Sequence, residues 1–324
     1  MHDLIIIGGS AAATSAGVYA ARRGLNFKII TKDFGGEVIT SGEIGNWPGI
    51  NQTDGITLSK QFKEHLKFYK ADLEEGVEVQ KISVQPDGSF CITAKKGSST
   101  SMASEKTADS SGSALKCDYE AKSIVFATGV HPRELGITGE KQFRNKGVSY
   151  CTTCDGPLFG GRVVATIGGG NSALESALML ADIASKVYVI NKNAQFKGEQ
   201  VLIDNLMKKQ NVEILYETGT KEIAGEQFVN TLKCTDKDGN EKELKVDGIF
   251  VHIGMVPNSD IAPEGIAKNQ FGEIMVDKAC VTNIPGFFAA GDVTDVPFKQ
   301  IVIASGMGCI STLSAVQYLN KLVK

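Results

Sequence analysis

The sequence lacks a strong excess of charge and the features of a secreted or membrane-spanning chain. Its 37 acidic and 34 basic residues leave a net charge of −3, which gives no reason to expect nucleic acid or an anionic membrane as partner. The N-terminus has no basic region of the kind that opens a signal peptide. No stretch approaches the roughly 20 apolar residues that span a bilayer. We therefore expect a globular protein of the cytoplasm.

The seven cysteines do not suggest the disulfide framework of a small secreted protein, which usually has an even number. Only Cys151 and Cys154 lie close together in the sequence. The other five occupy apolar or strand-like settings and are predicted to be inert: Cys91, Cys117, Cys234, Cys280 and Cys309. In a reducing cytoplasm, a close pair is more often catalytic or metal-binding than structural.

The Cys151–Cys154 pair is predicted to be redox-active. A Cys-x-x-Cys pair can alternate between dithiol and disulfide, and the spacing lowers the pKa of one thiol from about 8.5 to about 7. At neutral pH about half of that thiol is then thiolate, which is the attacking form. A zinc site would need two further ligands, and the sequence has neither a second such pair nor a histidine pair. No metal site is therefore predicted.

An internal repeat sets the expected architecture. The segment from Leu4 to Ala13 recurs from Val164 to Ala173, 160 positions later. Each copy begins with an apolar run, which predicts a buried parallel strand, and continues into an alanine-rich helix, expected at 11–23 and 172–184. Second strands follow at 27–31 and 187–191. The chain is therefore predicted to be an α/β protein with two Rossmann-like units, each binding one dinucleotide.

Each repeat carries a small-residue turn of the kind that holds a pyrophosphate. Small side chains let backbone N–H groups approach the phosphates at a helix N-terminus. In the first copy these positions are Gly8, Ser10 and Ala13, with serine in place of the second glycine. The second copy keeps both glycines, and its candidate cofactor residues are Gly168, Gly170, Asn171, Ser172 and Ala173.

Six motifs follow one another along the chain in an informative order. They are Gly35-Gly36 with Gly45-Asn-Trp-Pro-Gly49, Ala127-Thr-Gly129, Cys151-Thr-Thr-Cys-Asp-Gly156, Gly254-Met-Val-Pro-Asn258, Phe288-Ala-Ala-Gly-Asp-Val293 and Lys299-Gln-Ile301. In this order they resemble the low-molecular-weight thioredoxin reductases from end to end, apart from a serine-rich stretch at 97–113. We expect that stretch to be a surface excursion between two strands. The run from Cys154 to Phe159 also resembles the flavoprotein subunit of alkyl hydroperoxide reductase.

The first resemblance implies a discontinuous FAD domain, residues 1–130 and 255–324, with an NAD(P) domain that carries the cysteine pair inserted at 131–254. It further implies rotation of one domain against the other at crossings near Gly129 and Gly254. The cofactor-binding residues that it adds to the glycine turns are Thr31, Gly36, Glu37, Asn46, Ala127, Thr128, Gly129, Gly254, Gly291, Asp292, Lys299, Gln300 and Ile301.

The same resemblance implies an activity. Electrons would pass from NAD(P)H to FAD, then to the cysteine disulfide, and finally to a thioredoxin-like protein, in a homodimeric enzyme. By this resemblance Cys154 is the cysteine nearer the flavin, Cys151 attacks the partner disulfide, and Asp155 is a general acid/base. From the sequence alone, Asp155 could also be an exposed turn residue, as in most Asp-Gly pairs.

The residues leave several alternatives open. The second resemblance points to a peroxiredoxin- or glutaredoxin-like carrier as partner. A dithiol oxidase of this fold would instead pass electrons from a substrate dithiol to oxygen. A flavin-bearing redox sensor would bind flavin without turnover, and the intact cysteine pair disfavours it.

The preferred nucleotide is also open. Arginines that hold the 2′-phosphate of NADPH are absent from the run after the second strand, 191–197, and so is an acid that would favour NADH. Asn191 and Lys192 are the candidates there, and NADPH, NADH or a non-nicotinamide donor remain possible. His131 and His252 are interpreted as structural histidines, and Trp47 as a packing residue.

Overall fold

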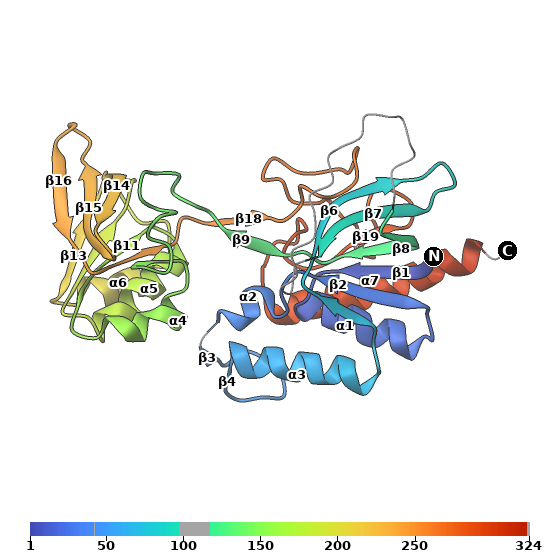
Figure 1. The fold of residues 1–324 in the computed structure, drawn as a ribbon. Coiled ribbons are helices and arrows are strands. Elements are labelled where there is room, and N and C mark those ends of the chain that lie inside the picture. Colours follow the sequence, from blue (N-terminus) through green and yellow to red (C-terminus); the bar gives the residue numbers. More distant parts are fainter. Residues whose placement is uncertain (42, 97–116, 323–324) are drawn as a thin grey trace. The chain divides into compact units, whose positions relative to one another are not determined.

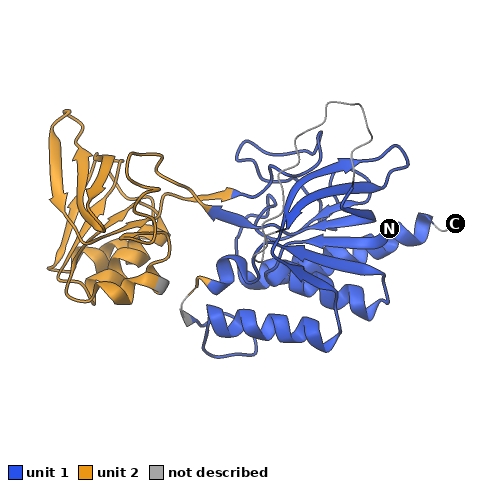
Figure 2. Cartoon of the chain, viewed as in Figure 1, with its two compact units in different colours: residues 1–39, 43–131, 257–324 blue, residues 40–42, 132–256 orange. Residues whose placement is uncertain are grey.

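The computed structural model describes residues 1–41, 43–96 and 117–322, so the serine-rich stretch lies outside the described residues. Contacts within the chain divide it into two compact units (Figure 2). Unit 1 comprises residues 1–39, 43–131 and 257–324, and unit 2 comprises residues 40–42 and 132–256. Two short strands at the unit boundaries, β9 (Val130–Pro132) and β18 (Met255–Pro257), pair with each other.

Unit 1 is built on a sheet in the order β5-β2-β1-β8-β7-β6, with β19 also paired to β8 (Figure 1). The pairs among β1, β2, β5, β8 and β19 are parallel, whereas β6–β7 and β7–β8 are antiparallel. The strands are β1 (His2–Ile7), β2 (Phe27–Thr31), β5 (Leu73–Glu75), β6 (Val77–Val84), β7 (Phe90–Lys96), β8 (Tyr119–Phe126) and β19 (Phe287–Ala289).

Helices cover one face of this sheet. They are α1 (Ala11–Arg22), α2 (Gly36–Ile39), α3 (Gly55–Phe68) and α7 (Ile301–Leu322), and a short hairpin of β3 (Glu43–Ile44) and β4 (Thr53–Asp54) precedes α3. The alternation of side chains along β1 explains the two layers, because Leu4 and Ile6 pack with the helices while Ile5 and Ile7 pack with β6 and β7. Asp54 caps α3, and its carboxylate accepts a hydrogen bond from the backbone N–H of Thr57 at 2.8 Å.

Unit 2 has a parallel sheet in the order β10-β17-β11-β12-β13 and a separate antiparallel sheet in the order β14-β15-β16. The strands are β10 (Val148–Ser149), β11 (Val163–Ile167), β12 (Lys186–Ile190), β13 (Val212–Leu215), β14 (Gly219–Gly225), β15 (Val229–Thr235), β16 (Glu241–Lys245) and β17 (Gly248–Val251). Its helices are α4 (Thr152–Asp155), the 3-10 helix η1 (Gly156–Phe159), α5 (Asn171–Ala181) and α6 (Gln200–Met207).

The two β-α-β units expected from the repeat are present. β1, α1 and β2 form the first, and β11, α5 and β12 form the second, with parallel strands in both. The predicted α/β class with two Rossmann-like units is confirmed. Both helices end before the predicted residue, α1 at Arg22 and α5 at Ala181.

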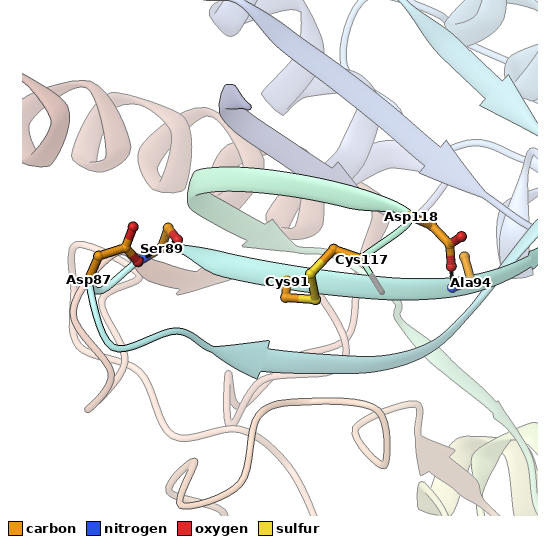
Figure 3. The surroundings of a disulfide bond; sticks show 6 residues. All are labelled: Asp87, Ser89, Cys91, Ala94, Cys117 and Asp118. Carbon is orange, nitrogen blue, oxygen red and sulfur yellow. Dashed lines mark hydrogen bonds between the residues drawn. A yellow bond between two sulfur atoms is a disulfide. The ribbon is translucent and has the colours of Figure 1, made fainter. Parts of the chain in front are cut away.

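The prediction that Cys91 and Cys117 are inert thiols is wrong. They form a disulfide between β7 and the residue preceding Asp118, at the start of β8 (Figure 3). Cys91 faces the core, and the Asp118 carboxylate accepts a hydrogen bond from the backbone N–H of Ala94 at 2.8 Å. The sequence could not show this pairing, because the cysteines lie 26 residues apart and meet only when β7 and β8 pair. Cys234, Cys280 and Cys309 are free thiols.

This disulfide should stabilise unit 1. A bond that closes a loop of this length removes chain entropy from the unfolded state and is expected to contribute about 3 kcal/mol. Cys117→Ser should therefore lower the free energy of unfolding of unit 1 by about that amount in urea. Cys309→Ser, at a thiol that is free, is the matched control. Equal unfolding midpoints for Cys117→Ser and the wild type would contradict a stabilising disulfide.

The expectation that no segment approaches the length and composition of a membrane span is also wrong. Helix α7, 22 residues long, is apolar enough to pass that test by length and composition alone. In the structure it packs on α1, and a Cβ added at Gly308 would lie 2.1 Å from the Ala12 carbonyl oxygen. The Thr312 hydroxyl also donates to the Ala16 carbonyl at 3.2 Å. The helix is thus closely packed on one side, while only a third of its most apolar window is buried.

Candidate redox and dinucleotide-binding site

The redox turn, residues 151–155, combines a disulfide cysteine with helix α4. The sulfur of Cys151 is disulfide-bonded, and α4 begins at the next residue. The backbone N–H of Cys151 donates to the Ser149 hydroxyl at 3.0 Å, and the N–H of Asp155 donates to the Cys151 carbonyl at 3.1 Å. Cys154 lies within α4, and its side chain is outside the described residues. The backbone of the turn is thus fixed from both ends.

A line of buried polar groups lies beneath this turn. The hydroxyl of Thr152 lies 2.6 Å from the Ser176 hydroxyl on α5 and 2.8 Å from Nε2 of His252, which follows β17. Burial lowers the pKa of His252 to about 4, so the imidazole is neutral at physiological pH. His252 is therefore a hydrogen-bonded histidine, in agreement with its interpretation as structural. Its contact with the redox turn was not predicted from the sequence.

The glycine turn of unit 2 has the geometry that its fingerprint predicts. Gly168 has φ +143°, and a Cβ at this position would lie 2.1 Å from the His252 carbonyl oxygen. A Cβ at Gly170 would meet no atom within 4 Å, so this position is open to a ligand. Ala173 is fully buried beneath the turn. Asn171 and Ser172 are exposed in the first turn of α5. The turn thus leaves a backbone surface free where a pyrophosphate can approach.

The segment after β12 folds back onto this turn. Asn191 is buried, and its amide is used within the loop: it donates to the Gln195 carbonyl at 3.0 Å and accepts from the backbone N–H of Asn193 at 3.1 Å. Lys192 is exposed. The backbone N–H of Lys197 donates to the Gly169 carbonyl at 2.7 Å, which ties this second exposed lysine to the glycine turn. The structure therefore favours lysines over Asn191 as groups that can meet a nucleotide phosphate.

The glycine turn of unit 1 repeats this geometry. A Cβ at Gly8, where φ is +136°, would lie 2.1 Å from the Ala127 carbonyl oxygen. The hydroxyl of Ser10 does not cap α1 but donates to the Gly35 carbonyl at 2.6 Å, beside Gly36 and Glu37 of α2. Serine at the second position of the fingerprint is thereby explained, since its side chain holds the next loop of the site. Ala13 is buried in α1, and Thr31 ends β2 with its hydroxyl bonded to the Asp33 carbonyl at 2.7 Å.

The late motif of unit 1 lies beside α1. A Cβ at Gly291, where φ is +79°, would lie 3.2 Å from Cβ of Ala12. The Oδ1 atom of Asp292 is buried, and no hydrogen-bond partner for it lies among the described residues. Burial also raises the pKa of this carboxyl. A buried polar atom without a partner is costly, so Asp292 fits a group that a bound cofactor would complete.

The motif before α7 adds two further contacts. Lys299 forms an ion pair with Glu273 at 2.8 Å, and the Asn46 amide donates to the Gln300 side chain at 3.2 Å. Ile301 begins α7. The structure therefore brings Asn46 and Gln300 together from sites 254 residues apart in the sequence.

The first crossing is hydrogen-bonded to Asn258, the last residue of the Gly254–Asn258 motif. The Thr128 hydroxyl donates to the Asn258 carbonyl at 2.7 Å, and the Asn258 amide donates to the Thr128 carbonyl at 2.8 Å. The Asn258 N–H also donates to the Gly129 carbonyl at 3.0 Å, and His131 Nδ1 lies 2.6 Å from Asn258 Oδ1. Gly254, with φ +107°, begins the second crossing. These hydrogen bonds join the first crossing to Asn258.

The described residues divide the predicted site between the units. Unit 1 holds the first glycine turn and the late motif, whereas unit 2 holds the second glycine turn and the redox turn. Within residues 1–41, 43–96 and 117–322, no three histidine, cysteine or acidic side chains are grouped to hold a metal ion. The described parts of the site are two glycine turns and one disulfide-bonded turn.

Comparison with known proteins places this geometry in a family. The family model of the pyridine nucleotide-disulphide oxidoreductases matches residues 2–308. The chain belongs to this family. FAD and NAD(P)H are the cofactors of these flavoproteins. Both glycine turns fit them, and so does the Asp292 Oδ1 atom, which has no hydrogen-bond partner among the described residues.

Three individual proteins are similar to this chain in sequence or in structure. The chain is 36% identical over 318 residues to an NADH dehydrogenase of Bacillus subtilis and 37% identical over 321 residues to an alkyl hydroperoxide reductase subunit of Escherichia coli. Each match covers 98% of this chain and 58% of the relative, so the chain spans little more than half of their length. Among solved structures, thioredoxin reductase of Lactococcus lactis superposes with a TM-score of 0.83 at 28% identity, covering 99% of this chain and 100% of that one. The resemblance to thioredoxin reductases is confirmed.

The buried His252 makes stability depend on pH. Its pKa is about 4 in the folded chain against an ordinary value of 6.5, so between these values the unfolded chain binds a proton that the folded chain does not. Stability should therefore fall as the pH drops from 6.5 to 4, by up to about 3 kcal/mol from this residue. Urea unfolding of the wild type and of His252→Gln as a function of pH measures this. The difference in free energy of unfolding between the two proteins should change between pH 6.5 and pH 4. A difference that stays constant over this range would contradict the assignment to His252.

Proposed function

We propose that this chain is an FAD-dependent disulfide reductase that passes electrons from NAD(P)H through FAD and the Cys151–Cys154 disulfide to a thioredoxin-like protein. The observation that carries the proposal is the presence, within one unit, of the Cys151 disulfide turn and a glycine turn with the geometry of a dinucleotide site. A protein that only stored or sensed flavin would have no need of both.

The residues divide into binding and redox groups. In unit 1 we assign the FAD site to two groups of residues. The N-terminal group is the first glycine turn with Thr31, Gly36 and Glu37 of α2, Asn46 and residues 127–129. The C-terminal group is Gly291, Asp292 and residues 299–301. In unit 2 we assign to the nucleotide the second glycine turn from Gly168 to Ala173 and Lys192. Asn191, whose amide orders the loop that carries Lys192, and Gly254 at the second crossing complete the assignment. Held by these residues, FAD would supply the two-electron chemistry that links the nicotinamide to the Cys151–Cys154 disulfide.

The chemistry of the cysteines then follows from thiol–disulfide exchange. The thiolate of Cys151 attacks one sulfur of the partner's disulfide and releases the other as a thiolate. Cys154 then attacks the mixed disulfide at Cys151, which restores the internal disulfide and frees the second partner thiol. We assign the exchange of protons with these two thiols to Asp155, the last residue of α4. Two electrons and two protons thereby pass to the partner.

The partner could also be the carrier of a peroxide-reducing system. This candidate rests on the 37% identity to an alkyl hydroperoxide reductase subunit, whose length exceeds that of this chain. Steady-state reduction of purified thioredoxin-, glutaredoxin- and peroxiredoxin-type carriers by the flavoprotein with NADPH or NADH separates the candidates. Turnover with none of them would contradict the proposed function.

A cytoplasmic homodimer completes the proposal. Val302 and Ile310 on α7 are 43% and 40% exposed, which leaves apolar surface on this helix for a second copy to cover. Sedimentation of the flavoprotein at micromolar concentration should give twice the chain mass of 34.5 kDa. A monomer would contradict this part.

A further inference from the structure

The side chain of Thr152 joins the redox turn to other elements of unit 2 by hydrogen bonds. This residue lies between the two cysteines, in a position where the Cys-x-x-Cys motif accepts any residue. Its side chain is nevertheless only 6% exposed, and that of Ser176, its partner on α5, is 4% exposed. A hydroxyl buried in this way is retained at little cost only when it is hydrogen-bonded. Thr152 meets that condition with two partners, Ser176 and His252.

The two partners come from separate parts of the dinucleotide-binding fold. Ser176 lies on the buried face of α5, and its hydroxyl is also 3.4 Å from the Thr166 hydroxyl on β11. His252 directly follows β17, and its backbone carbonyl is the atom that leaves no room for a side chain at Gly168. Helix α4 and helix α5 are in contact in unit 2 (Figure 1). The hydroxyl of Thr152 is therefore hydrogen-bonded both to helix α5 and to the residue that follows β17.

The methyl group of Thr152 lies on the side of Leu180 and Ile183. A Cβ placed at Gly156 would lie 3.5 Å from this methyl, 3.6 Å from Leu180 and 3.8 Å from Ile183, so the three groups surround one point beside the turn. The rotamer of Thr152 is restricted by its two hydrogen bonds. A β-branched residue with a locked χ1 in turn limits the backbone of the turn that carries the cysteines.

We propose that Thr152, Ser176 and His252 form a positioning network that holds the redox turn in its disulfide form and thereby sets how readily the Cys151 disulfide is reduced. The inference rests on the proposed function only in taking this disulfide as the one that carries electrons. The hydrogen bonds of Thr152 are present while Cys151 is disulfide-bonded, so their loss should destabilise the oxidised form of the turn. The equilibrium should then move toward the dithiol.

The test is an equilibrium measurement on the full flavoprotein. The protein is equilibrated anaerobically in dithiothreitol buffers of stated potential, the thiols are trapped by alkylation, and the tryptic peptide 147–162, which holds both cysteines of the turn, is quantified by mass. Thr152→Val keeps the shape and removes the hydroxyl. It should raise the equilibrium constant for reduction about tenfold, a shift of about 30 mV.

Three further variants show whether the effect belongs to the network. Thr152→Ser restores the hydroxyl and should return the constant to within about twofold of the wild type. Ser176→Ala removes one of the two partners and should give at least a threefold rise. Thr153→Val, at the exposed neighbour in the same turn, is the matched control and should change nothing. A purely structural role would lower the thermal midpoint without moving the potential.

The outcomes decide the proposal without reference to turnover. If Thr152→Val folds and its disulfide has the same reduction potential as in the wild type, the network does not set that potential and the proposal is wrong. If Thr152→Val does not fold, Ser176→Ala decides, and a change below threefold overturns the proposal. Because the buffer thiol replaces both nucleotide and partner protein, a failure of the proposed reductase activity leaves this measurement unaffected.

Discussion

Cys151→Ser should abolish electron transfer to protein disulfides and leave reduction of the flavin by nucleotide intact. The cysteine sulfur provides the attacking thiolate, and a serine hydroxyl cannot replace it because it remains protonated at neutral pH. We expect the turnover number for a thioredoxin-like carrier to fall by at least about 1000-fold. The rate of flavin bleaching by NAD(P)H should stay within about twofold of the wild type, since both glycine turns are untouched.

The matched control for this variant is Cys309→Ser, which removes a free, partly exposed thiol from α7. It should retain both half-reactions. Carrier turnover above one tenth of the wild-type rate in Cys151→Ser would show that the redox turn is bypassed, and the assignment of this disulfide would then be wrong.

Gly168→Ala should eliminate reduction of the flavin by nucleotide. The glycine has φ +143°, and the added Cβ would lie 2.1 Å from the His252 carbonyl oxygen, so backbone must move where the turn meets the end of β17. We expect the apparent affinity for NAD(P)H to fall at least about 100-fold, which corresponds to about 2.7 kcal/mol. FAD should remain bound, because its proposed residues lie in unit 1, and dithionite should still bleach it.

Gly170→Ala is the control that separates packing from binding. An added Cβ there meets no protein atom within 4 Å, so unit 2 should unfold at the same urea concentration as in the wild type. Stopped-flow absorbance of the flavin after mixing with NADPH or NADH measures both variants. Normal bleaching in Gly168→Ala would place the nucleotide elsewhere.

The fold was largely predictable because its strongest signals are local. The repeated run of apolar strand, small-residue turn and alanine-rich helix predicted β1–α1–β2 and β11–α5–β12, since each can be read within about 30 residues. The antiparallel strands β14, β15 and β16 carry no such repeat and were not anticipated. The apolar composition of α7 was underestimated, because small residues that pack on α1 do not form an uninterrupted apolar run.

The parts of the candidate site that the sequence did not predict depend on contacts between distant residues. The Cys91–Cys117 bond requires the pairing of β7 with β8, and the Thr152–His252 contact joins residues 100 positions apart. Asn191 was a candidate cofactor-binding residue from its place after β12, yet its amide is hydrogen-bonded within its own loop. Ser10 was unexplained until its hydroxyl was found on the Gly35 carbonyl.

The most direct test of the central claim is an anaerobic titration of the purified flavoprotein with NADPH and with NADH, followed by its visible absorbance. The account predicts that at least one nucleotide bleaches the flavin, that the better one reveals the preference left open at Lys192 and Lys197, and that an oxidised thioredoxin-like protein then restores the colour. Failure of both nucleotides to bleach a flavin that a reduced dithiol does bleach would contradict the account, because electrons would then enter through the disulfide rather than from a nucleotide at the glycine turn of unit 2.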